Sequence, residues 1–78
     1  MITKMILSEV EKGKYKIKNI DAGRKATERL ANLGVFSESE VEVLSNTKIC
    51  PIKIRVKGST YAIGRGLASK IEVKNDRS

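Results

Sequence analysis

The feature that most restricts the fold is a helix pattern that ends abruptly and gives way to a strand pattern. From Ala22 to Leu33, apolar residues recur every three or four positions, as in a helix with one buried face. Gly34 follows directly, and glycine readily adopts the left-handed conformation that ends many helices. Apolar and charged residues then alternate over residues 40–44, with Val41 and Val43 on the inward side, which is typical of a half-buried strand. The chain must therefore place one short amphipathic helix beside strands.

Short strand patterns account for most of the remaining sequence. Pro51 stands just before one of them, where its missing N–H costs least. Asp21 is expected to cap the start of the helix through its carboxylate. A tight turn is expected at Gly58-Ser59, and a helical turn at residues 64–68. The predicted strands are residues 6–10, 15–18, 40–44, 52–57, 60–63 and 71–73.

This pattern predicts a mostly β fold with one α-helix. Five to six short antiparallel strands around one helix form a small, partly open barrel. With 78 residues the chain is one domain, 1–78, with its core over about 5–74 and a frayed tail at 75–78. Cys50 is the single cysteine and histidine is absent, so an internal disulfide and a structural zinc site are excluded. A core of this size rarely supplies more than about 3–5 kcal/mol of net stability.

The net charge of +7 is unevenly distributed along the chain. Residues 1–45 carry eight Lys/Arg and seven Asp/Glu, which gives +1, whereas residues 46–78 carry eight and two, which gives +6. Such asymmetry indicates an anionic partner. The longest apolar runs are three residues and the first residues lack the apolar region of a signal peptide, so we expect a cytoplasmic protein with no direct membrane insertion.

No residue pattern for catalysis is present. Without histidine, no base is positioned to activate a nucleophile, and Cys50 is expected to be a small, semi-buried residue rather than a reactive thiol. The carboxylates of Glu38, Glu40 and Glu42 could in principle hold a metal ion, but charged strand faces are ordinary and no further ligand is evident. We therefore expect a binding protein with no enzymatic activity, no bound metal and no cofactor.

Three basic residues, Lys53, Arg55 and Lys57, are predicted to share the outward face of one strand. One interpretation is an electrostatic docking face. The other, which we favour, is that these cations pair across the hairpin with Glu40 and Glu42. Aromatic side chains for base stacking are scarce, which argues against binding of single-stranded nucleic acid.

Two further residues are candidates for contact with a partner. Phe36 follows the corner at Gly34 and either closes one end of the barrel or forms an apolar contact with a partner. Arg65 lies between Gly64 and Gly66, which resemble the start of a phosphate-binding loop without the rest of that motif. The candidate partner-binding residues are thus Phe36, Lys53, Arg55, Lys57 and Arg65.

Several ordered segments resemble the domain family of ferrous iron transport protein A (FeoA). RLANLGV followed by VEVL, within residues 29–44, is similar to the family signature RLxxLGhxxGxxVxV, and PIKIRVKG at 51–58 is similar to its strand DPIxIxVxG. The YAI triplet at 61–63 stands where the family has LAL, and the ending over residues 68–73 is similar as well. The positions that carry the signature are Leu30, Leu33, Gly34, Val41, Val43, Pro51, Ile54, Val56 and Gly58.

The resemblance implies an SH3-like barrel and a cytosolic accessory protein of bacterial ferrous iron uptake. Such a protein would bind and modulate the cytosolic part of the membrane GTPase permease FeoB, and a weak homo-oligomer is left open. The alternatives are a nucleic-acid-associated SH3-like domain, or the isolated equivalent of the SH3-like domain of metal-dependent transcription regulators. The departures from the signature lie in loops, so they bear on partner specificity more than on fold. They are Ser37-Glu38 in place of Pro-Gly, Ile49-Cys50 in place of Gly-Asp, and Gly64-Arg65-Gly66.

Overall fold

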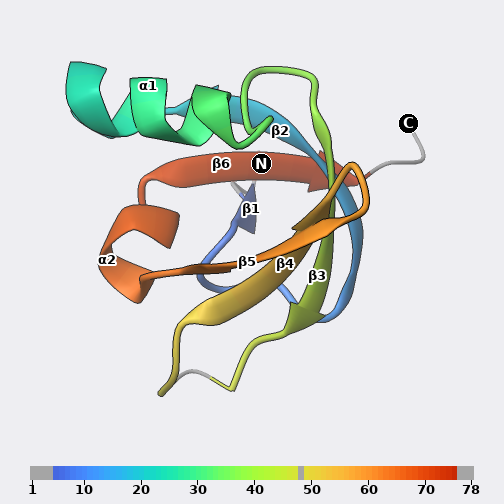
Figure 1. The fold of residues 1–78 in the computed structure, drawn as a ribbon. Helices are drawn as coiled ribbons and strands as arrows, with labels where there is room; N and C mark the ends of the chain where they lie inside the picture. The colour runs from blue at the N-terminus through green and yellow to red at the C-terminus, as the bar shows by residue number, and fades with distance from the viewer. Residues whose placement is uncertain (1–4, 48, 76–78) are drawn as a thin grey trace, which may run out of the picture.

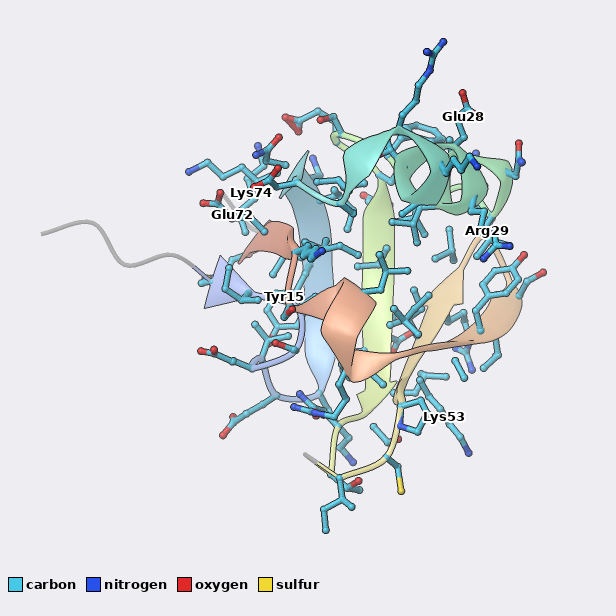
Figure 2. All side chains as sticks on the ribbon, turned by 90° about the vertical axis from the view of Figure 1, so that its left-hand side faces the viewer. Tyr15, Glu28, Arg29, Lys53, Glu72 and Lys74 are labelled. Atoms are coloured by element: carbon cyan, nitrogen blue, oxygen red, sulfur yellow. The ribbon has the colours of Figure 1, made fainter. Side chains whose placement is uncertain are left out.

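The computed structural model describes residues 5–47 and 49–75. Six strands, each antiparallel to its neighbours, form one open sheet in the order β1-β6-β2-β3-β4-β5, with α1 across one end of the strands (Figures 1 and 2). The predicted mostly β, partly open barrel is therefore confirmed, with β1 and β5 as its two edges. The elements are β1 (Met5–Ile6), β2 (Gly13–Ile20), α1 (Gly23–Asn32), β3 (Glu40–Ser45), β4 (Ile52–Val56), β5 (Ser59–Ile63), α2 (Arg65–Ala68) and β6 (Ile71–Asn75).

The core is built from the inward side of each strand. Strand β4 shows this most clearly, because its buried and exposed residues alternate along its whole length. Full burial of one such aliphatic side chain stabilises the fold by about 1.5–3 kcal/mol relative to exposure. The largest fully buried side chains are those of Leu7, Ile17, Leu30, Val35, Val43, Ile52, Ile54, Val56, Ile71 and Val73.

The end of α1 has the geometry that the glycine predicted. The N–H of Gly34 donates to the carbonyl of Ala31 at 3.0 Å, and the N–H of Val35 donates to that of Leu30 at 2.8 Å. These two bonds form a Schellman motif, which places Gly34 at φ +95° and packs Val35 against Leu30. A Cβ atom at position 34 would lie 3.2 Å from Val56 Cγ1. Glycine is thus required here by both backbone angle and space.

The start of α1 corrects the expectation for Asp21. The helix begins at Gly23, with Ala22 as the residue before it and no side-chain cap. Asp21 still belongs to the end of the sheet, because its N–H donates to the carbonyl of Lys70 at 2.8 Å. That bond holds the carboxylate before the helix, so it does not reach the first turn.

Several strand boundaries also differ from the prediction, and three of them have a clear physical reason or change the place of a named residue. The first strand ends at Ile6 rather than Val10, because the N–H of Glu9 bonds back to the Ile6 carbonyl at 2.8 Å and turns the chain. The tight turn is Lys57-Gly58, both with positive φ, so Lys57 lies beyond β4 rather than on its outward face. Asn75, expected in the tail, belongs to β6, and residues 76–78 lie outside the described part.

Candidate docking surface

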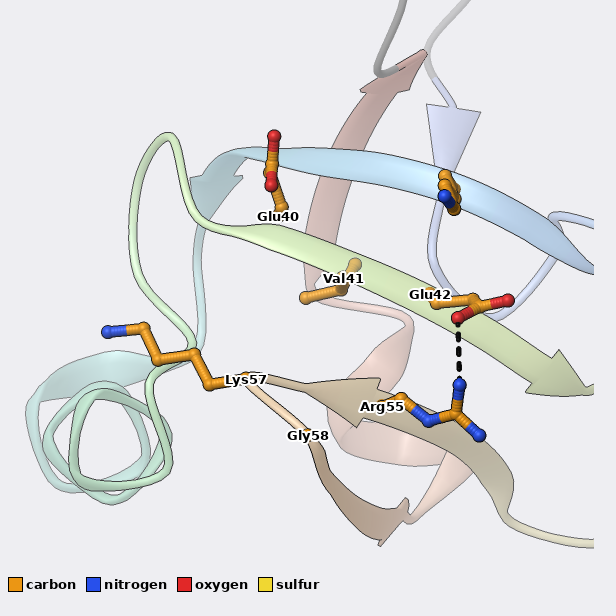
Figure 3. A pocket seen from close by; sticks show the side chains of 7 residues that line it. Glu40, Val41, Glu42, Arg55, Lys57 and Gly58 are labelled. Atoms are coloured by element: carbon orange, nitrogen blue, oxygen red, sulfur yellow. Dashed lines mark hydrogen bonds and ion pairs between the residues drawn. The ribbon is translucent and has the colours of Figure 1, made fainter.

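The outward side of β4 presents two of the three predicted cations. Lys53 and Arg55 are exposed and point away from the core. Arg55 lies opposite Glu42 of β3, and its Nη1 is 3.4 Å from Glu42 Oε1 (Figure 3). No described carboxylate comes within ion-pair distance of Lys53, which projects from the sheet in Figure 2. The expected pairing across the hairpin therefore holds for Arg55 and not for Lys53.

The third cation lies over the exposed aromatic ring. Phe36 is 44% exposed, and the Nζ atom of Lys57 lies 5.5 Å from its ring centroid. A cation–π contact of this kind on the surface contributes about 0.5–1 kcal/mol. The N–H of Phe36 donates to the buried Ser39 Oγ at 3.0 Å, which fixes the corner that carries the ring. Phe36 therefore does not close the barrel end completely, and a large part of its ring faces solvent.

Two shallow hollows lie along this surface. One is lined by both signs of charge and lies between the outward sides of β3 and β4 (Figure 3). The other lies beside the ring of Phe36. The first is lined by Lys14, Glu40, Val41, Glu42, Arg55, Lys57 and Gly58, and the second by Lys16, Phe36, Glu38, Ser39, Glu40 and Lys57. We refer to Phe36, Lys53, Arg55 and Lys57 as the docking surface.

Arg65 stands apart from the docking surface. Its Nη1 donates to Asn46 Oδ1 and its Nη2 to the carbonyl of Ser8, both at 2.7 Å. The amide of Asn46 in turn donates to the carbonyls of Ser8 and Val10, at 3.0 and 2.9 Å. This group, the Arg65 clamp, joins α2 to the loop after β1 and to the end of β3. Ser8 and Asn46 were missed from the sequence because they lie 57 and 19 residues from Arg65 and carry no local pattern.

Cys50 differs from its prediction as a semi-buried residue. It is exposed in the loop between β3 and β4, next to Ile49, which is 87% exposed. Within this loop the N–H of Cys50 donates to Thr47 Oγ1 at 3.3 Å, while its side chain faces solvent. Among the described residues, no three potential metal-ligating side chains of His, Cys, Asp or Glu gather. The carboxylate of Glu38 instead lies 3.0 Å from Lys74 Nζ.

The small, partly open barrel of six antiparallel strands defines an SH3-like domain. Neither helix in the described residues is long and apolar enough to cross a bilayer. The model of the FeoA domain matches residues 5–75, which is nearly the whole chain. The chain therefore belongs to the FeoA family.

Individual relatives agree with this family and with the fold. An Fe(2+) transport protein A from Methanocaldococcus jannaschii is 46% identical over 59 residues, which span 76% of this chain and 71% of that protein. A crystal structure of an iron uptake regulatory protein (FeoA) has a TM-score of 0.84 at 34% identity, covering 92% of this chain and 97% of that one. The regulator ScaR with bound Cd2+ has a TM-score of 0.83 at 19% identity, over 92% of this chain and 36% of its own, and so shares the fold.

Proposed function

We propose that this chain is a cytosolic, non-enzymatic accessory protein of ferrous iron uptake that docks on the cytosolic part of the permease FeoB. The relatives named for Fe(2+) transport and iron uptake support the pathway. The observation that carries the docking role is the docking surface, where Lys57 lies over the exposed ring of Phe36 and the exposed cations Lys53 and Arg55 project from the adjoining strand β4. Arginine and aromatic side chains are enriched at protein interfaces, where a few of them supply most of the binding free energy.

The alternative of a nucleic-acid-associated domain has weaker support. Stacking of unpaired bases needs exposed aromatic faces. Tyr15 is buried and Tyr61 is half-buried, so Phe36 is the one exposed aromatic residue in the described part of the chain. Its ring is already covered on one side by Lys57. The proposed partner is therefore a protein.

The double substitution Lys53→Glu with Arg55→Glu tests the proposal. We expect the affinity for purified full-length FeoB in detergent, measured by calorimetry, to fall at least about tenfold, or roughly 1.4 kcal/mol. The melting temperature should change by only a few degrees, because the Arg55–Glu42 pair is exposed and such pairs contribute about 0–1 kcal/mol.

The matched control is Arg24→Glu with Lys25→Glu on α1. It makes the same change in net charge and breaks an ion pair that is more exposed than Arg55–Glu42, Arg24–Glu28 at 3.8 Å. The control should retain affinity. Equal loss in both double variants would mean that net charge alone attracts the permease, and a large drop in melting temperature for the β4 variant would mean that its cations are structural.

A further inference from the structure

The outer edge of β5 is open. Strand β5 pairs with β4 on one side and is the last strand of the sheet on the other. Beyond that pairing, none of the backbone groups of Ser59–Ile63 bonds to another described element. An edge strand of this kind presents unpaired N–H and C=O groups to solvent and can accept a further strand.

The hairpin turn determines which groups point outward. Strands β4 and β5 are joined by the two-residue turn Lys57-Gly58, with φ +51° and +84°. In such hairpins the residues that flank the turn, here Val56 and Ser59, exchange backbone hydrogen bonds, and bonded pairs then recur at every second residue. The N–H and C=O groups of the intervening residues Thr60 and Ala62 therefore point to the open edge.

The residues of β5 do little to protect this edge. Natural edge strands are commonly blocked by lysine, proline, a bulge or an inward-pointing charge. The sequence of β5, STYAI, contains no charge and no proline, and its pairing with β4 runs in register without a bulge. The open edge is therefore free to pair along its length.

The positive charge beside this edge favours an added strand that carries acidic side chains. On the outward face, Thr60 lies opposite Arg55, and Ala62 lies opposite Lys53. Arg55 points the other way, to Glu42 of β3 (Figure 3). Lys53 has no carboxylate within ion-pair distance among the described residues, and Ala62 is small, so the Lys53 side chain can extend across Ala62 toward a strand added beyond. An acidic side chain beside Ala62 on that strand would meet the Lys53 ammonium.

We propose that β5 accepts, as an additional strand, an extended acidic segment of a protein partner. The proposal rests on the proposed function, because it specifies how the permease would engage the docking surface. A second copy of this chain fits less well. Pairing of two β5 strands would supply no acidic side chain to Lys53, because β5 carries no charge.

The first test uses Ala62→Pro and its control Ala62→Ser. The N–H of Ala62 points away from β4, so proline removes a group needed by the added strand while it leaves the β4–β5 pairing intact. We expect Ala62→Pro to lose at least about tenfold in affinity for full-length FeoB, and Ala62→Ser to retain it. Thr60→Pro repeats the test if Ala62→Pro proves unstable on heating.

The second test needs no substitution. A short synthetic peptide that alternates glutamate with valine is added to the full chain, and amide exchange is followed by NMR. The exchange of the Thr60 and Ala62 amides should slow, whereas those of Tyr61 and Ile63, already paired with β4, should change little. A matched peptide with glutamine in place of glutamate should have a smaller effect, since it lacks the charges.

The outcomes separate this inference from the proposed function. If Ala62→Pro binds the permease normally while Lys53→Glu with Arg55→Glu does not, strand addition is wrong and the docking surface stands. If neither variant loses affinity, both proposals fail. If amide exchange slows as the concentration of the chain alone is raised, the occupant of the edge is a second copy, and the proposal of an acidic partner is wrong. Equal effects of the two peptides would also contradict an acidic partner, because they would show that the glutamate charges do not matter.

Discussion

Glu38 has a left-handed backbone, with φ +71°, although it carries a side chain. The FeoA signature has glycine at this position. The conformation is fixed because the N–H of Glu38 donates to the carbonyl of Ile17 at 2.8 Å. A non-glycine residue in this region costs roughly 1–2 kcal/mol, and the exposed ion pair with Lys74 offsets at most about 1 kcal/mol of it. The corner is therefore strained by a single side chain.

Replacing Glu38 with glycine should relieve that strain. We expect Glu38→Gly to be more stable than Glu38→Ala by about 1 kcal/mol in urea unfolding, because both variants lose the ion pair and only glycine accepts the angle freely. Glu38→Ala should be slightly less stable than the original chain. If the glycine variant were no more stable than the alanine variant, the backbone angle would carry no cost.

Tyr15 should make the free energy of unfolding fall at alkaline pH. Burial disfavours the phenolate and, with a smaller effect from the nearby charge of Glu11, raises the pKa of Tyr15 above its ordinary value of 10.0. The phenol also donates to the carbonyl of Glu11 at 2.9 Å. Because the folded state holds this proton more tightly than the unfolded state, the stabilisation is complete below about pH 10 and is lost as pH rises through the raised pKa.

Tyr15→Phe should remove this dependence. We expect the variant to be less stable at neutral pH, since the hydrogen bond is gone, but to lose less stability than the original chain between neutral pH and strongly alkaline pH. Urea unfolding at a series of pH values measures the difference. Parallel curves for the two chains would show that Tyr15 does not titrate differently in the folded and unfolded states.

At the scale of elements, the Arg65 clamp joins three segments that no strand pairing connects. Arg65 at the start of α2 reaches the loop after β1 and the end of β3 through Ser8 and Asn46. The clamp therefore lies on the side of the barrel where the sheet is open. It ties the linker between β5 and β6 to the rest of the fold, which gives Arg65 a structural role. The candidate role of Arg65 in docking remains a prediction.

Arg65→Ala should destabilise the fold far more than loss of an exposed arginine. Hydrogen bonds from a charged donor contribute about 1.5–3 kcal/mol, and the carbonyl of Ser8 would lose one of its donors. Arg55→Ala, which breaks an exposed pair, is the control and should cost less than about 1 kcal/mol. Similar melting temperatures for the two variants would show that the clamp contributes little.

The elements divide into those that local sequence predicts and those that it does not. The end of α1 at Gly34 and the alternation in β3 and β4 follow from chain chemistry within a few residues, and they were predicted correctly. The short β1, the Lys57-Gly58 turn and the uncapped start of α1 depend on backbone bonds to neighbouring segments. Sheet order and the Arg65 clamp depend on residues far apart in sequence, which one sequence does not pair. For the docking surface, the residues and the pairing of Arg55 with Glu42 could be named from the sequence, but the contact of Lys57 with the Phe36 ring could not.

At the scale of the whole molecule, the excess of positive charge lies mainly in the second part of the chain, which carries +6 of the +7. The first part nearly balances its own cations with carboxylates, and Arg24 pairs with Glu28 within it at 3.8 Å. A surface charged in this way attracts anionic partners over about a Debye length, roughly 8–10 Å at physiological salt. Salt should therefore weaken any complex that this charge helps to form, and by an amount that depends on how many anionic groups the partner brings into contact.

Salt titration distinguishes a protein partner from a nucleic acid. Contact with many phosphates weakens binding by about 10³–10⁵ between low and physiological salt, because counterions must be recaptured. We expect permease binding, to which the ring of Phe36 would add an apolar contact, to fall by only about tenfold over the same range. A steep fall for the permease, or tight binding of single-stranded DNA at physiological salt, would favour the nucleic-acid alternative.

The place of β6 in the sheet has a consequence for the order in which the fold can form. Residues 71–75 form the strand that separates β1 from β2 and pairs with both. Until β6 is in place, β1 has no neighbour in the sheet and one side of β2 is unpaired. The β2–β3–β4–β5 meander needs only strands that follow one another in sequence, so it can form first, whereas the core closes only when β6 joins residues far apart in the chain. A variant cut before residue 71 should therefore keep the meander but leave its core open to proteases.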